Sequence, residues 1–183
     1  MIKNRKILIY GWFGEDNLGD ELILDGITAL VRRVSPQATI NVIGSRPNRI
    51  RQYHHDDYSR VSTYINRNPK TWIRSVKYGA IDALLNKSDA DLVILATGGA
   101  LSDWNESSTD GIFDLINYWS KKGIPICMFG VGVGPISKQE SYNKFYKVLS
   151  KLQLITVRDE YSYDELDKIG LTNIKLTKDV VYE

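Results

Sequence analysis

The amino-acid sequence predicts an α/β fold, in which a parallel sheet is doubly wound with helices on both faces. Two observations indicate this class. Short apolar segments alternate along the whole chain with segments whose hydrophobic residues have helical spacing. The apolar segments are also hydrophobic at successive positions, which is typical of parallel strands buried on both faces. Because the chain has 183 residues and contains no linker-like tract, we expect one domain over residues 1–183.

The predicted strands are short apolar runs that end at a glycine or a polar residue. The run 91–96 is the most apolar, and the run 6–10 is closed by Gly11. The run 61–65 lies in an otherwise polar region. In chain order, the strands are expected at residues 6–10, 39–43, 61–65, 91–96, 125–129, 154–157 and 174–176.

The predicted helices lie between these strands and carry apolar residues at helical spacing. The first helix ends before Pro36, because proline disfavours helical backbone in the residue that precedes it. The last helix is followed by Gly170, and glycine commonly terminates helices. In chain order, the helices are expected at residues 20–33, 71–85, 112–122, 138–152 and 161–169.

Composition excludes several classes of protein. Hydrophobic residues make up 43% and charged residues 25% of the chain, as in ordinary globular proteins, and no apolar run reaches eighteen residues. The single cysteine, Cys127, excludes an internal disulfide, and one cysteine with two histidines excludes a zinc finger. We therefore expect a cytoplasmic protein without a metal or cofactor. We interpret His54 and His55 as residues of a solvated loop.

Positive charge is concentrated in one part of the chain. The segment that begins at Arg46 and ends at Lys77 carries eight arginines and lysines against two aspartates, whereas the whole chain has a net charge of +2. A solvated basic face is the simplest interpretation, and contact with an anionic lipid surface is an alternative. Nothing in the segment resembles a nucleic-acid-binding module, so nucleic acid is not an expected partner.

Five polar or glycine-rich segments follow predicted strands. Parallel strands joined by right-handed crossovers all end at the same edge of the sheet, where open α/β sheets bind ligands. The sequence therefore predicts one site at this carboxyl edge. The contributing segments are residues 11–21, 97–103, 130–135, 158–159 and Asp179.

The first of these segments places glycines before a predicted helix. Glycines allow sharp turns and close approach of backbone amides to a ligand, and a helix start offers unpaired N–H groups. The spacing matches neither GxGxxG nor GxxxxGK[ST], which speaks against a dinucleotide or ATP site. An alternative is that Asn17 or Asp20 only caps the helix and that the glycines only form a tight turn.

The later segments each have two interpretations. The alternating glycines of residues 130–135 can serve a ligand or close packing at a strand end. Asp103 can present a carboxylate to a ligand or cap a local turn. Arg158 can bind an anionic substrate, and Asp159 can act as a carboxylate in the site or cap the following helix.

Taken together and in order, these segments resemble the motifs of the polysaccharide pyruvyl transferase family. The first family motif reads approximately GxxGxxNxGDExxL. It is matched by Gly11, Gly14, Asn17, Gly19, Asp20, Glu21 and Leu24. The later motifs are matched by Gly98, Gly99 and Asp103, by Gly130, Gly132, Gly134 and Pro135, by Arg158, Asp159, Glu160 and Ser162, and by Asp179.

The chain departs from the family pattern at three positions, and it is shorter than the members of the family. Asp16 stands where glycine is frequent, Thr97 replaces the first glycine of a triplet, and Val180 replaces a common proline. Family members are longer and carry a second Rossmann-like domain. The chain thus resembles the Rossmann-like N-terminal half of a GT-B-like two-domain transferase, with the second domain absent. We expect little or no turnover by the chain alone.

The resemblance implies a reaction. The family transfers the pyruvyl group of phosphoenolpyruvate to two sugar hydroxyls as a ketal, in the synthesis of cell-surface polysaccharides. Phosphoenolpyruvate is the donor substrate and no cofactor is expected. The implied acceptor is a sugar or a lipid-linked glycan, and the basic segment that begins at Arg46 would contact the inner membrane surface. A second-half domain or a further copy of the chain is the expected protein partner.

The resemblance also implies roles for individual residues. Arg158 is expected to bind the carboxylate or phosphate of phosphoenolpyruvate, and Asp103 or Asp159 is expected to act as the catalytic base. The other expected substrate-binding residues are Gly14, Asn17, Gly19, Asp20, Glu21, Gly98, Gly99, Gly132 and Gly134. Two alternatives remain at this point: a glycosyltransferase half-domain that binds a nucleotide sugar, and a non-catalytic half that binds a partner protein.

Overall fold

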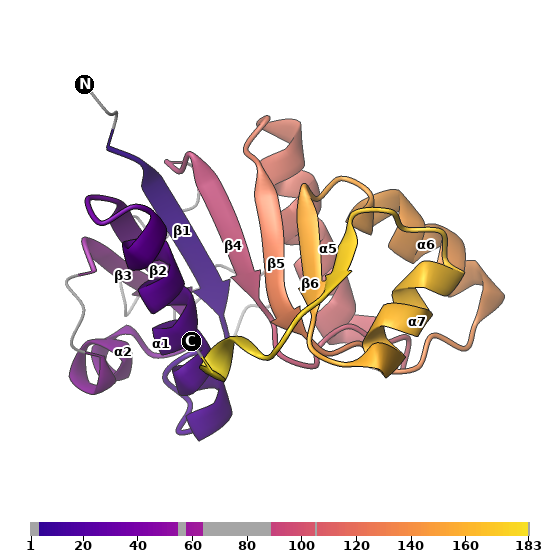
Figure 1. Ribbon diagram of the computed structural model, residues 1–183, viewed down its shortest axis with the longest axis horizontal. Helices are drawn as coiled ribbons and strands as arrows, with labels where there is room; N and C mark the ends of the chain where they lie inside the picture. The colour runs from indigo at the N-terminus through magenta and orange to yellow at the C-terminus, as the bar shows by residue number, and fades with distance from the viewer. Residues whose placement is uncertain (1–3, 55–57, 64–88, 105, 183) are drawn as a thin grey trace. The chain divides into compact units, whose positions relative to one another are not determined.

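The computed structural model describes residues 4–54, 58–63, 89–104 and 106–182 (Figure 1). The chain forms two compact units, Met1–Ala96 and Thr97–Tyr182. The expectation of a single domain over the whole chain stays a prediction. Within the described residues, no helix is both long enough and apolar enough to cross a membrane.

The first unit contains a four-stranded parallel sheet. Its described elements are β1 (Lys6–Gly11), α1 (Leu18–Val34), β2 (Thr39–Gly44), α2 (Pro47–Tyr53), β3 (Arg60–Thr63) and β4 (Leu92–Ala96). The strands lie in the order β3-β2-β1-β4, with β1 between β2 and β4, as Figure 1 shows. Leu8, Ile9, Ile40 and Leu95 are completely buried, so the centre of the sheet is covered on both sides.

Helix α1 forms where the sequence predicts a helix, and local signals explain both of its ends. The side chain of Asn17 accepts a hydrogen bond from the amide of Gly19 (3.1 Å) and so caps the first turn. Asp20 and Glu21 lie in the first turn and arginines lie in the last, which complements the helix dipole. The chain leaves the helix at Ser35, directly before Pro36.

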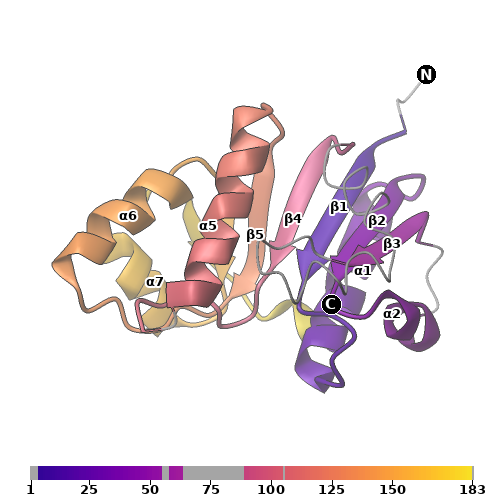
Figure 2. The same ribbon diagram turned by 180° about the vertical axis from the view of Figure 1, so that it is seen from behind.

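The second unit contains a three-stranded parallel sheet in the order β5-β6-β7. Its elements are α5 (Glu106–Lys121), β5 (Ile126–Val131), α6 (Gln139–Leu149), β6 (Leu154–Val157), α7 (Glu160–Lys168), β7 (Ile174–Leu176) and the 3-10 turn η1 (Val180–Tyr182). Helix α5 runs along β5 on the face turned to the viewer in Figure 2. Trp119 of α5 is completely buried, and Phe113 packs edge-on against Phe145 of α6 with ring centroids 5.0 Å apart.

The predicted fold class, α/β with parallel strands and flanking helices, is confirmed. Helix α2 lies in a segment that the sequence pattern left as polar, and its seven residues begin at Pro47, a favourable first helical position. Helix α5 begins at Glu106, six residues before the start expected at residue 112. The helix expected at residues 71–85 falls outside the described part of the chain.

Candidate active site

In the second unit, the two glycine-rich segments lie side by side. The amide of Gly132 donates to the carbonyl of Gly98 (2.8 Å), and the amide of Gly134 donates to the carbonyl of Leu101 (2.7 Å). A parallel bridge joins Leu101 to Val133. Because the amides of Gly132 and Gly134 are used inside the protein, these glycines do not offer them to a ligand. Gly132 and Gly134 can therefore contribute to a binding site only through the space that their missing side chains leave.

Each of these glycines leaves space for a particular neighbour. A Cβ atom at position 134 would lie 2.8 Å from the Cβ of Ser102, so the position is closed to a larger residue. A Cβ at position 132 would lie 3.2–3.6 Å from atoms of the Arg158 guanidinium. Gly99 differs, because its Cβ would meet no atom within 4 Å and its φ is not positive. Packing therefore does not require glycine at position 99.

Arg158 follows β6 and lies against Gly132. Its Nη1 atom donates to Oδ2 of Asp179 at 3.0 Å, and its Nε atom lies 4.0 Å from Oδ2 of Asp159. The other oxygen of Asp179 accepts from the amide of Val181 (3.3 Å), which fixes the carboxylate at the start of η1. The Arg158 side chain remains 37% exposed, so part of its guanidinium is accessible to an anion.

An open surface pocket of about 520 Å³ lies at this arginine. It is lined by Arg158, Asp159, Glu160, Leu176, Thr177, Lys178, Asp179 and Tyr182. The pocket brings together two of the predicted segments, residues 158–159 and Asp179. Its lining carries two cations, Arg158 and Lys178, and three carboxylates, those of Asp159, Glu160 and Asp179. An anion could therefore bind here only through direct hydrogen bonds to the cations, and not through the net charge of the pocket.

Asp159 caps helix α7. Its Oδ1 atom accepts from the amide of Ser162 (2.7 Å), while its side chain stays 47% exposed. The hydroxyl of Ser162 in turn accepts from the amide of Val133 (2.8 Å) and ties α7 to the second glycine-rich segment. The structure thus shows the capping role that was the alternative for Asp159, and it leaves the second carboxylate oxygen beside Arg158.

Asp103 is buried and holds the backbone that leads into α6. Its Oδ2 atom accepts from the amides of Ser137 (2.6 Å) and Lys138 (2.7 Å). Burial raises the pKa of Asp103. These two amide hydrogen bonds, the charge of Lys138 and a hydrogen bond with Ser141 together lower it more, so the pKa lies below its ordinary value. A buried carboxylate with these contacts is a weak proton acceptor. The environment therefore favours a structural role for Asp103 over the predicted role as base.

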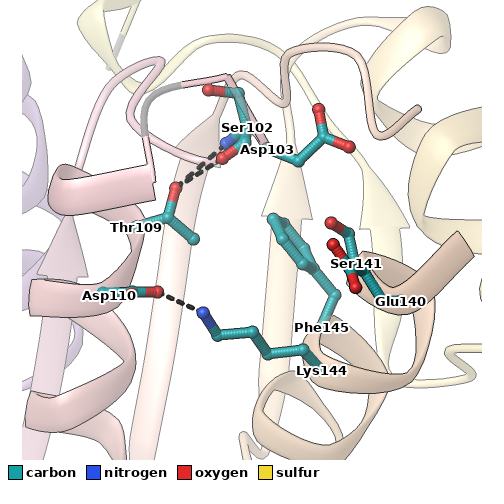
Figure 3. A pocket seen from close by; sticks show the side chains of 8 residues that line it. All are labelled: Ser102, Asp103, Thr109, Asp110, Glu140, Ser141, Lys144 and Phe145. Carbon is teal, nitrogen blue, oxygen red and sulfur yellow. Dashed lines mark hydrogen bonds and ion pairs between the residues drawn. The ribbon is translucent and has the colours of Figure 1, made fainter. Parts of the chain in front are cut away.

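Asp103 borders a smaller pocket of about 270 Å³ between α5 and α6 (Figure 3). Thr109 fixes the loop beside it, because its hydroxyl accepts from the amide of Ser102 (3.2 Å) and donates to the carbonyl of the same residue (2.8 Å). Across the pocket, Lys144 forms an ion pair with Asp110. These contacts join the two helices and the loop through residues that no family motif includes.

In the first unit, the glycines of the first motif are required by packing. A Cβ at position 11 would lie 2.3 Å from Cζ of Phe13 and 2.6 Å from the carbonyl oxygen of Ala96. Gly14 has φ 85°, and a Cβ there would lie 2.8 Å from the carbonyl oxygen of Arg46. Close packing therefore explains the glycine at both positions without a ligand.

Asn17, Gly19 and Asp20 lie at the start of α1 and are wholly or partly accessible. The Nδ2 atom of Asn17 donates to Oδ2 of Asp20 (2.7 Å), while its Oδ1 atom caps the helix. Glu21, by contrast, is buried, and its Oε1 atom accepts from the amide of Gly14 (2.6 Å). Glu21 thus organises the motif loop from inside the protein.

The interpretation of His54 as a solvated loop residue is wrong. Its side chain is 1% exposed, and its two ring nitrogens lie 2.7 Å from Oε2 of Glu21 and 2.6 Å from Oδ1 of Asp25. The spacing of Glu21 and Asp25, one helical turn apart, was the available signal, because residues four apart share a helix face. Nothing local in the sequence indicates which distant side chain meets that face. His55 lies outside the described residues.

Asp16 has a left-handed backbone, with φ 62°. This conformation explains why glycine would suit the position. The Asp16 carboxylate accepts from the hydroxyl of Tyr53 (2.6 Å) and pairs with Arg49. The hydrogen bond from Tyr53 and the one from Arg49 lower the pKa of Asp16, so the carboxylate is stabilised in its charged form.

Part of the basic segment is neutralised by this same loop. Arg49 pairs with Asp16, and Arg46 lies 2.8 Å from Oε2 of Glu15. The arginines and lysines of the basic segment from residue 67 onward lie outside the described residues. Contact of the basic segment with a membrane surface stays a prediction.

Comparison with known proteins identifies the family. A family model described as polysaccharide pyruvyl transferase matches residues 17–182. The solved structure of S. aureus TarJ has 21% sequence identity and a TM-score of 0.42, and the match covers 92% of this chain and 42% of that chain. For S. aureus TarJ in complex with NADPH, the identity is 16%, the TM-score is 0.37 and the coverage is 95% of this chain and 56% of that chain. This chain therefore spans about half the length of these solved chains.

The search among curated proteins gives no match. The family model, however, includes the motif residues from Asn17 to Asp179. Because the matched residues make up most of the chain, the protein belongs to the polysaccharide pyruvyl transferase family.

Proposed function

We propose that this chain forms part of an enzyme that transfers the pyruvyl group of phosphoenolpyruvate to two hydroxyls of a sugar, in the synthesis of cell-surface polysaccharides. The observation that carries the proposal is the placement of Arg158, which Asp179 holds against Gly132 at the edge of an open pocket. Membership of the family supports the reaction class. A cytoplasmic location follows from the proposal, because phosphoenolpyruvate is an intracellular metabolite.

The reaction converts the C2 carbon of phosphoenolpyruvate into a ketal carbon. A general acid adds a proton to C3, which becomes a methyl group and leaves C2 electrophilic. The first sugar hydroxyl forms a bond to C2 as a base removes its proton, and the bond from C2 to the phosphate oxygen breaks. The second hydroxyl then attacks C2 and loses its proton. Of the two hydroxyl protons, one balances the proton added to C3 and the other leaves with inorganic phosphate.

Arg158 is proposed to bind the carboxylate or the phosphate of this donor. A guanidinium can form two parallel hydrogen bonds to either group, and the ion pair with Asp179 keeps it in one orientation before the donor arrives. Gly132 permits that orientation. Gly98 and Gly99 are proposed to border the bound donor, since Gly99 is a glycine that the protein's own packing does not require.

Asp159 is proposed as the base. One of its oxygens is occupied in capping α7, and the second lies beside Arg158 in a half-exposed position. Asp103 is the weaker candidate, because the amide hydrogen bonds to its Oδ2 atom stabilise the charged carboxylate and help to keep its pKa below the ordinary value. In the first unit, Asn17, Gly19 and Asp20 are proposed to contact the sugar acceptor. A second domain, or a further copy of the chain, would supply the remaining groups.

Ligand-induced thermal stabilisation tests the proposal. A ligand that binds only the native state raises the melting temperature, and a concentration of about 100 times Kd adds about 2.7 kcal/mol. We expect phosphoenolpyruvate to stabilise the wild type and Lys121→Ala, a change on the exposed end of α5, but not Arg158→Ala. Stabilisation by UDP-sugars instead of phosphoenolpyruvate would indicate the nucleotide-sugar alternative. Equal stabilisation of wild type and Arg158→Ala would remove Arg158 from the site.

A further inference from the structure

His54 connects α2 to the loop of the first motif through α1. It is the residue directly after α2, and its amide donates to the carbonyl of Ile50 (3.1 Å). The side chain reaches Glu21 through Nε2 and Asp25 through Nδ1. Glu21 uses its other oxygen to accept from the amide of Gly14. A continuous chain of three contacts therefore runs from Asp25 through His54 and Glu21 to the backbone of the motif loop.

The geometry defines the protonation state of His54. A neutral imidazole carries one N–H group and one acceptor nitrogen. With a carboxylate oxygen at 2.7 Å from Nε2 and another at 2.6 Å from Nδ1, a neutral ring would place one nitrogen lone pair against a carboxylate. The imidazolium donates to both oxygens. With both carboxylates ionised, both contacts are therefore hydrogen bonds only when the ring is charged.

The surroundings of His54 agree with this state. Burial lowers the pKa of His54. The hydrogen bonds to Glu21 and Asp25 and the charges of these two carboxylates raise it by more than burial lowers it, so the pKa lies above its ordinary value of 6.5. Among the described residues, the other titratable group against the ring is Tyr58, whose ring centroid lies 6.3 Å away. Tyr53 and Arg49, on the preceding helix, are directed to Asp16.

We propose that His54 is a positioning residue, whose charged ring orients Glu21 so that Glu21 holds the amide of Gly14 and fixes the first-motif loop. The loop carries Asn17, Gly19 and Asp20, so the consequence for acceptor binding rests on the proposed function. The positioning itself does not. Arg46 and Arg49 assist from the same side, because they pair with Glu15 and Asp16 of the loop.

The proposal has a pH dependence of defined sign. A group whose pKa is raised in the folded state stabilises that state fully below its unfolded pKa, and the contribution is lost as the pH rises through the folded pKa. The order of the loop should therefore decrease from about pH 6.5 upward, in the range set by the raised pKa of His54. The equilibrium between the fixed and the released loop should shift about tenfold for each unit by which the pKa is raised.

Two measurements by NMR on the whole chain without ligand test this proposal. The ring protons of His54 should titrate above pH 6.5, and the protection of the Gly14 amide against hydrogen exchange should decrease over the same range. In Glu21→Gln, the side-chain oxygen still accepts from Gly14, and its NH₂ group can donate to a neutral His54. This variant should keep the protection of Gly14 and lose its pH dependence. His54→Gln should also lose that dependence.

Each outcome has a defined meaning. A His54 ring that titrates at or below pH 6.5, or a Gly14 protection that does not change with pH in the wild type, would overturn the proposal. If His54→Gln does not fold, Glu21→Gln still tests the proposal. In this variant, a pH dependence of Gly14 protection as large as in the wild type would contradict the role of the charged pair of His54 and Glu21. These readouts use no phosphoenolpyruvate. A missing response to phosphoenolpyruvate would therefore count against the proposed function alone.

Discussion

The guanidinium of Arg158 lies directly against the backbone of Gly132, so that a Cβ atom at position 132 would be 3.2 Å from Nη2 and 3.4 Å from Nε. Asp179 holds the same guanidinium from another side, at 3.0 Å. The arginine is thus confined between a glycine from one motif and a carboxylate from another. The motif that contains Gly132 and the motif that contains Arg158 are therefore in direct contact.

Gly132→Ala should displace Arg158. A Cβ at 3.2 Å is closer than an ordinary van der Waals contact, so the guanidinium has to move by a few tenths of an ångström. We expect phosphoenolpyruvate to bind roughly fivefold more weakly, because the loss of one well-aligned hydrogen bond costs about 1 kcal/mol. Titration of the ligand by calorimetry measures the change. Gly111→Ala is the control, since a Cβ at position 111 meets no atom within 4 Å, and an equal affinity in the two variants would contradict the displacement of Arg158.

Asp103→Asn should destabilise the second unit. The substitution keeps one acceptor oxygen but removes the charge to which the amides of Ser137 and Lys138 donate, so we expect a loss of about 1–2 kcal/mol at pH 7. Because the folded pKa of Asp103 is lowered, its contribution is present above the unfolded pKa and is lost as the pH falls through the folded value. Denaturant unfolding of both proteins at neutral and acidic pH measures this.

The difference between wild type and Asp103→Asn should therefore become smaller below about pH 4. Asp110→Asn is the matched control, since its exposed pair with Lys144 contributes at most about 0.5 kcal/mol. A stability difference for Asp103→Asn that stays constant down to pH 2 would argue against a charged capping role.

Asp16→Ala and Asp16→Gly separate two effects at one position. Alanine keeps the Cβ atom in a left-handed backbone and loses the contacts with Arg49 and Tyr53, whereas glycine loses the contacts but relieves the backbone strain. We expect the melting temperature of Asp16→Ala to be the lowest of the three proteins. The gap between wild type and Asp16→Gly should shrink in high salt, which screens the ion pair. Thermal melting at two salt concentrations tests both statements, and an alanine variant as stable as the glycine variant contradicts the first.

Gly11→Ala should disturb folding rather than ligand binding. Its Cβ would lie 2.3 Å from Phe13, which is completely buried, and 2.6 Å from a backbone oxygen. Overpacking of this kind costs about 1–3 kcal/mol. Chemical denaturation measures the loss, with Gly111→Ala as a control, since a Cβ at position 111 meets no atom within 4 Å. If Gly11→Ala were as stable as the wild type, the packing explanation for the first glycine of the motif would be wrong.

Local pattern was sufficient for most of the fold. Strands β6 and β7 occur at the residues that their short apolar runs predict, and α1 ends where Pro36 requires it. These features depend on neighbouring residues, whose spacing the sequence shows directly. Helix α2 was missed because it has only seven, mostly polar residues, which is too short for a helical pattern of apolar residues to be recognised. Its tertiary contacts, such as the pair between Arg49 and Asp16, cannot be found from local pattern.

The sequence by itself determined that this is an α/β protein with the motifs of the polysaccharide pyruvyl transferase family. It predicted five segments for a site, of which residues 158–159 and Asp179 line one pocket. Only the tertiary structure decided what individual residues do there. Gly11 gives room to Phe13, Gly132 gives room to Arg158, and Asp103 holds two amides. His54 joins Glu21 and Asp25 from 33 and 29 residues away. A residue type and its spacing define local conformation and chemical capacity, but the partner of a side chain depends on which distant segments the fold brings into contact.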